Sequence, residues 1–147
     1  MQFRELPLKN AMLVEIEPQS DERGLFARLF CEEEFSNAGL PVYWPQINIS
    51  FTSVAGTVRG MHYQAAPYEE PKLVRCTRGR VHDVIIDLRL DSTTYCQHFA
   101  IEMSALNRKS LFVPAGFAHG FQTLENDTEI LYLMGASYNP KAQRGVR

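Results

Sequence analysis

Short runs rich in Val, Ile, Phe and Tyr recur along this chain, and turn-forming residues separate them about every ten residues. This spacing is typical of an antiparallel sandwich or barrel, because each run has the length of one strand. A helical pattern is confined to Glu32–Ala38, where glutamates stand at the positive end of the helix dipole and Gly39 can end the helix. The sequence therefore predicts an all-β fold with one short peripheral helix.

The same pattern predicts the position of each strand. Hairpin turns fit Ser20–Gly24 and Thr77–Arg80, which contain the residues that tight turns favour. The expected strands are Met12–Glu17, Leu25–Phe30, Val42–Thr52, Val58–Gln64, Lys72–Thr77, Val81–Leu88, Tyr95–Met103, Leu111–Val113, Ala118–Leu124 and Glu129–Leu133.

Composition narrows the class of protein. A chain of 147 residues that is 45% hydrophobic can bury one sizeable core, so residues 1–147 are expected to form a single domain. A net charge of −2 without charge runs argues against nucleic-acid or membrane-surface partners. Three widely spaced cysteines, and no apolar stretch that resembles a signal peptide or a membrane span, predict a cytoplasmic location.

Polar residues alternate with apolar ones along Gln46–Phe51, so that Gln46, Asn48 and Ser50 share one strand face. An exposed amphipathic strand is one interpretation. We prefer a barrel whose polar interior holds a ligand, because His62 and Gln64 share a face in the next expected strand in the same way.

Arg59 and His62 are three residues apart, so strict alternation would place them on opposite faces of the strand. A β-bulge at Gly60 would shift the phase by one residue and bring both side chains into one cavity. We therefore expect an irregularity at this point. A regular ladder through Arg59–His62 would argue against a shared site.

A second cluster of polar residues lies in the C-terminal half. The Pro114-x-Gly116 turn leads His119 into an expected strand, where a lone histidine could simply be a hydrogen-bonded core residue. Tyr132 and Lys72, each within an apolar strand, add an acid and a cation to the same expected cavity.

Four motifs resemble the dTDP-4-dehydrorhamnose 3,5-epimerase family, namely Asp21–Phe26, Val58–Gln64, Lys72–Arg75 and Val113–Phe121. The resemblance runs from Asp21 to Arg147 with nearly unbroken spacing. It implies a cupin jelly-roll β-barrel that needs no metal or organic cofactor. It also implies a dTDP-linked 4-keto-6-deoxy sugar as substrate, and a homodimer in which an N-terminal segment of one subunit completes the partner's site.

The resemblance also implies roles for individual residues. His62 corresponds to the catalytic base, Tyr132 to the proton donor on the opposite sugar face, and Lys72 to the group that faces the C4 oxygen. The substrate-binding positions are Arg23, Phe26, Gln46, Asn48, Arg59, His119 and Tyr138, with Phe26 and Tyr138 as stacking surfaces for the base.

The residue types suit this chemistry. Inversion of a carbon next to a ketone requires a group that removes a proton from one face and another that returns one to the opposite face. Histidine, with an ordinary pKa of about 6.5, can accept a proton at neutral pH, and tyrosine, near 10, can donate one. A lysine stabilises the developing enolate oxygen, and arginines match the paired oxygens of a diphosphate.

The match to the family is incomplete in two places. The chain stops at Arg147, whereas family members typically continue with a segment that includes an aspartate paired with the base histidine, so this tail is expected to be missing. Asp83 could orient either His119 or His62. Ala27 stands where the family often has a carboxylate after Phe26, which leaves open whether C3, C5 or both are inverted.

Two alternatives remain at this stage. The Pro114-x-Gly116-x-x-His119 motif also matches a metal-ligand motif of metal-dependent cupins, although His62-Tyr63-Gln64 offers a poor first ligand set. A non-catalytic sugar-nucleotide binding module is the other alternative. The presence of an acid and a base together favours catalysis.

Overall fold

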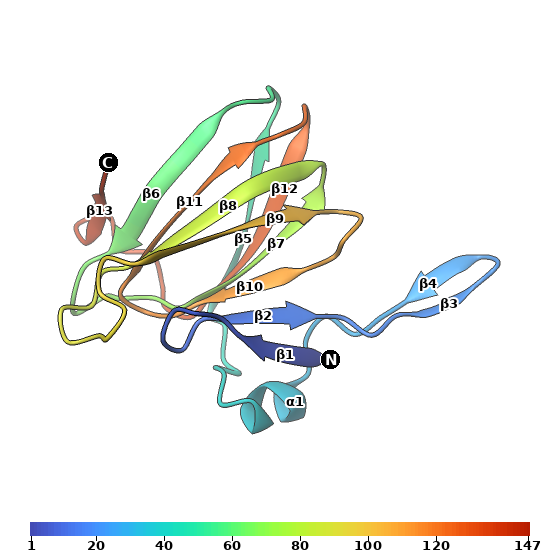
Figure 1. Ribbon diagram of the computed structural model, residues 1–147, viewed down its shortest axis with the longest axis horizontal. Coiled ribbons are helices and arrows are strands. Elements are labelled where there is room, and N and C mark those ends of the chain that lie inside the picture. Colours follow the sequence, from blue (N-terminus) through green and yellow to red (C-terminus); the bar gives the residue numbers. More distant parts are fainter.

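The computed structural model describes all 147 residues and consists almost entirely of two antiparallel β-sheets (Figure 1). The six-stranded sheet contains, in spatial order, β1 (Gln2–Glu5), β2 (Met12–Glu15), β10 (Ser110–Val113), β7 (Lys72–Arg78), β12 (Thr128–Met134) and β5 (Gln46–Thr52). The five-stranded sheet contains β13 (Gln143–Gly145), β6 (Val58–Gln64), β11 (Phe117–Thr123), β8 (Arg80–Asp87) and β9 (His98–Ser104). This confirms the expected all-β jelly-roll class, although the two sheets are not hydrogen-bonded into a closed barrel.

The core fills the space between the two sheets. Val74 and Ile130 from one sheet meet Ile85 and Met103 from the other, and all four are fully buried. A second cluster covers the opposite face of the six-stranded sheet, where Phe35 of helix α1 (Glu32–Asn37) is inserted. The single short helix is therefore peripheral, as expected. No helix is long and apolar enough to cross a membrane.

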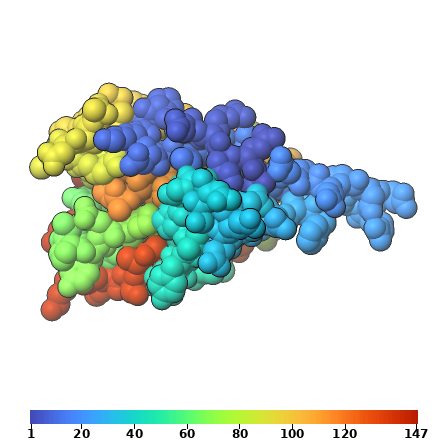
Figure 2. All heavy atoms as spheres, turned by 90° about the horizontal axis from the view of Figure 1, so that it is seen from below, coloured from blue at the N-terminus to red at the C-terminus, as the bar shows by residue number.

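A two-stranded hairpin stands apart from both sheets. Its strands β3 (Gln19–Asp21) and β4 (Gly24–Phe26) pair only with each other, through Asp21 and Gly24 at the tip. The hairpin, called here the arm, projects from the body of the molecule (Figures 1 and 2). The hairpin turn predicted at Ser20–Gly24 is confirmed, and the arm leaves its apolar side chains without a covering layer.

The turn predicted at Thr77–Arg80 exists, but it does not form a hairpin. Strands β7 and β8 belong to different sheets, and the chain crosses between them at Gly79, whose φ is +73°. A tight turn and a sheet-to-sheet crossover favour the same residue types. The predicted hairpin pairing is therefore wrong.

Strand boundaries differ from the expected ones for identifiable reasons. The strand expected over Val42–Thr52 begins only after Pro45, which has no N–H for the ladder. The strand expected over Tyr95–Met103 begins at His98, because Thr94 is bound to the Asp87 carboxylate in a tight loop. The strand expected over Leu25–Phe30 ends at Phe26. Val58–Gln64 forms a strand with the predicted limits.

Candidate functional site

A cavity of about 480 Å³ lies between the two sheets, within the size range of small-molecule sites. Most of its polar lining comes from positions that the sequence singled out. The lining residues are Asn48, Ser50, Val58, Arg59, Gly60, His62, Lys72, His119, Gly120, Phe121, Tyr132 and Met134. Asn48 and Ser50 on the polar face of β5 therefore point into the cavity. This agrees with the prediction of a polar interior that can hold a ligand.

The titratable groups of the cavity come from opposing walls. His62 on β6 and His119 on β11 belong to the five-stranded sheet and are direct partners in the ladder. Tyr132 on β12 and Lys72 on β7 belong to the six-stranded sheet. The rings of His119 and Tyr132 meet edge to face, with centroids 6.0 Å apart. A ligand in the cavity would thus lie between histidines on one side and a tyrosine and a lysine on the other.

The predicted irregularity in β6 is present. His62 pairs with His119 and Arg59 pairs with Phe121. Two residues therefore lie between the paired positions on β6, but only one lies between them on β11. The extra residue shifts the alternation by one, and both Arg59 and His62 line the cavity.

Glycine makes this bulge possible. Gly60 has a φ of +119°, and a Cβ there would lie 2.5 Å from the Cα of Gly120 and 2.8 Å from the carbonyl oxygen of His119. Neither neighbour is a flexible side chain. The close approach of β6 and β11 at the cavity wall therefore depends on the absence of a side chain at Gly60.

We expect Gly60→Ala to lower the free energy of unfolding by roughly 2–4 kcal/mol, because it combines backbone strain with a clash against backbone atoms. Gly56→Ala is the matched control, since Gly56 has a φ of +80° but open space around its Cα. Denaturant unfolding of both variants measures the difference. If both variants lose the same free energy of unfolding, the close approach of β6 and β11 does not contribute to the cost of Gly60→Ala.

The cavity adjusts the acid–base character of its two opposing groups. Partial desolvation of the ring, followed by the nearby charges of Lys72 and His119, lowers the pKa of His62 below its ordinary value, although the residue as a whole is exposed. Burial, followed by the Asp83 charge, raises the pKa of Tyr132 above its ordinary value. At neutral pH the site thus has a histidine that is free to accept a proton and a tyrosine that holds one.

Asp83 orients His119 rather than His62. Its two carboxylate oxygens lie 2.9 Å and 3.0 Å from His119 Nε2, and both residues are buried. The pair joins β8 to the adjacent β11. Of the two partners that the sequence left open, His119 is the one that the Asp83 carboxylate contacts.

Three of the predicted binding residues are joined by hydrogen bonds that begin at the cavity lining. Gln46 Nε2 donates to Asn48 Oδ1 at 3.1 Å, and the backbone N–H of Tyr138 donates to Gln46 Oε1 at 3.1 Å. Tyr138 remains half exposed. Gln46 thus links the cavity-lining Asn48 to the backbone of Tyr138.

Arg23 and Phe26 are not brought to the cavity of their own chain. Both lie on the arm, which extends away from the body (Figure 2). Arg23 pairs with Asp21 at 2.5 Å, and Phe26 is 78% exposed. Within one chain, the cavity is lined by His62, Tyr132, Lys72, Asn48, Arg59 and His119, whereas Gln46 and Tyr138 are joined to it only through Asn48 and the arm residues lie away from it.

Sequence reasoning missed the residues that support the cavity from behind. Gly120 is needed for the close approach to Gly60, and Glu70 pairs with Lys72 from outside the cavity. The spacing of Glu70 and Lys72 around Pro71 was visible in the sequence. Their contact depends on how the loop before β7 turns, which spacing does not determine.

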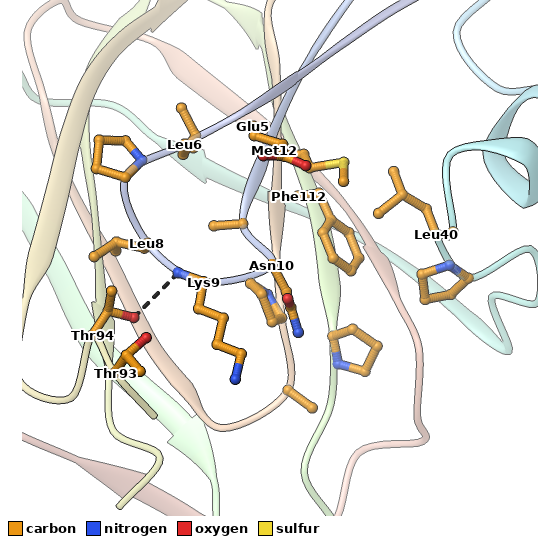
Figure 3. A pocket seen from close by; sticks show the side chains of 17 residues that line it. Glu5, Leu6, Leu8, Lys9, Asn10, Met12, Leu40, Thr93, Thr94 and Phe112 are labelled. Atoms are coloured by element: carbon orange, nitrogen blue, oxygen red, sulfur yellow. Dashed lines mark hydrogen bonds between the residues drawn. The ribbon is translucent and has the colours of Figure 1, made fainter. Parts of the chain in front are cut away.

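The largest cavity lies elsewhere and lacks the chemistry of the site. It measures about 720 Å³ and is formed mainly by the loop between β1 and β2 (Figure 3). Lys9 and Thr94 face each other there, and the Lys9 N–H donates to Thr94 Oγ1 at 3.2 Å. It contains no histidine or tyrosine. No group of three or more His, Cys, Asp or Glu side chains in the chain could hold a metal ion.

Comparison with known proteins yields one consistent family. The sequence profile of dTDP-4-dehydrorhamnose 3,5-epimerases matches residues 5–147. The enzyme of that name from Sinorhizobium fredii is 42% identical over 147 residues, which span 100% of this chain and 75% of the relative.

Solved structures agree with this assignment. The dTDP-4-dehydrorhamnose 3,5-epimerase of Bacillus anthracis, with TDP and pyrophosphate bound, superposes with a TM-score of 0.96 at 36% identity, covering 99% of this chain and 83% of that one. A dTDP-6-deoxy-D-glucose-3,5-epimerase of Legionella pneumophila in complex with dTDP-4-keto-L-rhamnose gives 0.92 at 29% identity, covering 99% and 77%.

Proposed function

The chain belongs to the dTDP-4-dehydrorhamnose 3,5-epimerase family, and we propose that it epimerises a dTDP-4-keto-6-deoxy sugar at C3, C5 or both. The observation that carries the proposal is the placement of His62 and Tyr132 on opposite walls of one cavity. A binding protein has no need of a base and an acid on opposite sides of its ligand.

In the proposed mechanism, His62 removes the proton from the carbon next to the C4 ketone. The electron pair of the broken C–H bond moves onto the C4 oxygen, where the Lys72 ammonium stabilises the enolate. Tyr132 then donates its phenolic proton to the other face of the same carbon. The resulting tyrosinate is reprotonated by solvent and His62 releases its proton, so the enzyme returns to its initial state.

The remaining polar residues hold the nucleotide sugar. Arg59 is fixed by bonds from Nε to Thr52 Oγ1 at 2.9 Å and from an Nη to the Phe51 carbonyl at 3.3 Å, and its guanidinium suits a diphosphate oxygen. Asn48 and His119 reach the same space, and the rings of Tyr138 and Phe26 provide stacking surfaces for the base.

The test is incubation of the purified protein with the 4-keto sugar nucleotide in heavy water, followed by NMR at C3 and C5. Deuterium at both carbons indicates a 3,5-epimerase, and deuterium at one carbon indicates a monoepimerase. A non-catalytic binding module would bind dTDP but incorporate no deuterium. A stoichiometric transition metal in the purified protein would instead favour a metal-dependent cupin.

We also propose that the protein works as a homodimer whose arms complete each other's cavities. The outer face of β5 exposes Ile47 by 62% and Ile49 by 65%, which is unusual for aliphatic side chains on a sheet. On the arm, Phe26 is even more exposed than these two residues. A second copy that covers these side chains would place Arg23 and Phe26 beside a cavity other than their own.

Mixing two defective chains tests this arrangement. One chain carries Arg23→Ala with Phe26→Ala, and the other carries His62→Ala. Random exchange of subunits makes half of the dimers heterodimers. In each heterodimer, one of the two sites combines an intact His62 with an intact arm. About a quarter of all sites should therefore regain activity. Failure of the mixture to exceed either variant alone would exclude exchange of the arms.

The lowered pKa of His62 predicts how the reaction depends on acidity. The base acts only in its neutral form, which predominates above its pKa. We therefore expect the rate of deuterium uptake at pH 6.5, the ordinary pKa of histidine, to be more than half of its plateau value, and to reach half only at lower pH. A half-maximal rate above pH 6.5, measured across the pH range, would contradict this.

The cytoplasmic location stays a prediction from the sequence. Its support is that all three cysteines are free thiols, of which Cys76 is buried in the core. Cell fractionation tests it directly.

A further inference from the structure

A buried carboxylate lies behind the lysine of the cavity, and the proposed mechanism does not use it. Glu70 precedes Lys72 by two residues, in the loop between β6 and β7. The exposed fraction is 6% for the Glu70 side chain and 9% for that of Lys72. Glu70 Oε1 lies 3.3 Å from Lys72 Nζ, yet Glu70 is not part of the cavity lining. The carboxylate therefore contacts the lysine from outside the substrate space.

Gln64 holds this carboxylate in place. Its Nε2 donates to Glu70 Oε2 at 3.0 Å and also contacts the carbonyl oxygens of Tyr68 and Ser137. Its Oε1 accepts the backbone N–H of Asn139 at 2.6 Å. Both oxygens of Glu70 are thus engaged, one by Gln64 and one by Lys72, and the glutamate has little freedom to turn away.

Glu70 supplies the negative charge that balances the Lys72 ammonium. The charged or titratable groups that share the cavity with the lysine are His62, His119, Tyr132 and Arg59, while Glu70 contacts it from outside and Asp83 lies behind His119. Two of these are carboxylates, and Asp83 is bound by His119. A buried ammonium is costly unless a partner of opposite charge accompanies it. Glu70 supplies that partner.

We propose that Glu70 is a positioning residue of the epimerase reaction, whose carboxylate keeps the Lys72 ammonium charged and directed into the cavity. An ammonium has three N–H donors, so the contact with Glu70 leaves others for the C4 oxygen of the sugar. Glu70 does not touch the substrate and acts only through Lys72. The inference rests on the proposed function, because it concerns the group that stabilises the enolate.

The test is Glu70→Gln, which removes the charge and nearly preserves the size of the side chain. We expect kcat for deuterium uptake to fall roughly tenfold to a hundredfold, as for the loss of one charge-assisted hydrogen bond, with little change in KM. The alkaline limb of the rate profile should begin at lower pH, because a buried ammonium without its counter-ion loses its proton more readily. Glu69→Gln, the same change at the exposed neighbouring residue, should behave as the wild type.

A double-mutant cycle separates positioning from general support of the fold. If Glu70 acts through Lys72, Glu70→Gln should have no further effect in a Lys72→Gln background. Glu70→Asp retains the charge and should keep the alkaline limb of the wild type. If the glutamine variant does not fold, Glu70→Ala takes its place in the cycle, because it also removes the carboxylate.

The outcomes distinguish this inference from the function on which it rests. Absence of deuterium uptake by the wild type would overturn both. Uptake by the wild type, with Glu70→Gln indistinguishable from Glu69→Gln, would overturn only the role of Glu70. An equal loss of rate with and without Lys72, at an unchanged pH profile, would also overturn it.

Discussion

His62→Ala is expected to reduce deuterium uptake at C3 and C5 by roughly a hundredfold to ten-thousandfold, the range for removal of a general base. Without the imidazole, the only other histidine that lines the cavity is His119, whose Nε2 is already engaged by Asp83. Binding of dTDP should persist. NMR of the sugar in heavy water, with calorimetry for dTDP, measures both quantities.

His82→Ala is the matched control for this variant. His82 is an exposed histidine on β8, next to Asp83 but on the opposite strand face, and its loss should leave the rate unchanged. Uptake by His62→Ala at the control's rate would show that another group is the base. If His62→Ala loses dTDP binding as well as deuterium uptake, His62 has a binding role.

Tyr132→Phe should separate exchange from inversion. His62 can still remove the proton and return a deuteron to the same face, but the opposite face has lost its donor. We expect inversion to fall by roughly a hundredfold or more, the usual contribution of a general acid, while exchange falls less. The ratio of deuterium uptake to product epimer, followed by NMR over time, measures the separation.

The phenylalanine ring should preserve the packing of Tyr132 against His119, so the variant is expected to remain folded. Tyr63→Phe is the control, since Tyr63 follows His62 on β6 and is not part of the cavity lining. Equal losses of exchange and inversion would contradict the division of roles between His62 and Tyr132.

Local residue chemistry was sufficient to predict much of the site. Alternation in β5 placed Asn48 inside the cavity, and the conflict between Arg59 and His62 could be resolved only by an extra residue at Gly60, which the structure contains. Both predictions depended on interactions within one strand. The spacing of side chains along a strand is fixed by its geometry.

Features that depend on distant parts of the chain could not be predicted in this way. The turn at Gly79 has the composition of a hairpin turn, and only the strands that it joins show that it is a crossover. Strands β1, β3 and β13 are short and mostly exposed, so they lack the apolar pattern that identifies a strand. The pairing of Asp83 with His119 depends on which strands are neighbours, which no spacing reveals.

The position of β5 has a consequence for how the isolated chain behaves in solution. It is the last strand of its sheet, so one side of its backbone is unpaired, and its outward side chains include Ile47, Ile49 and Phe51. A free apolar edge of this kind invites strand addition and aggregation. An isolated chain is therefore open to strand addition, and changes that weaken the proposed self-association should reduce the soluble yield before they reduce catalysis.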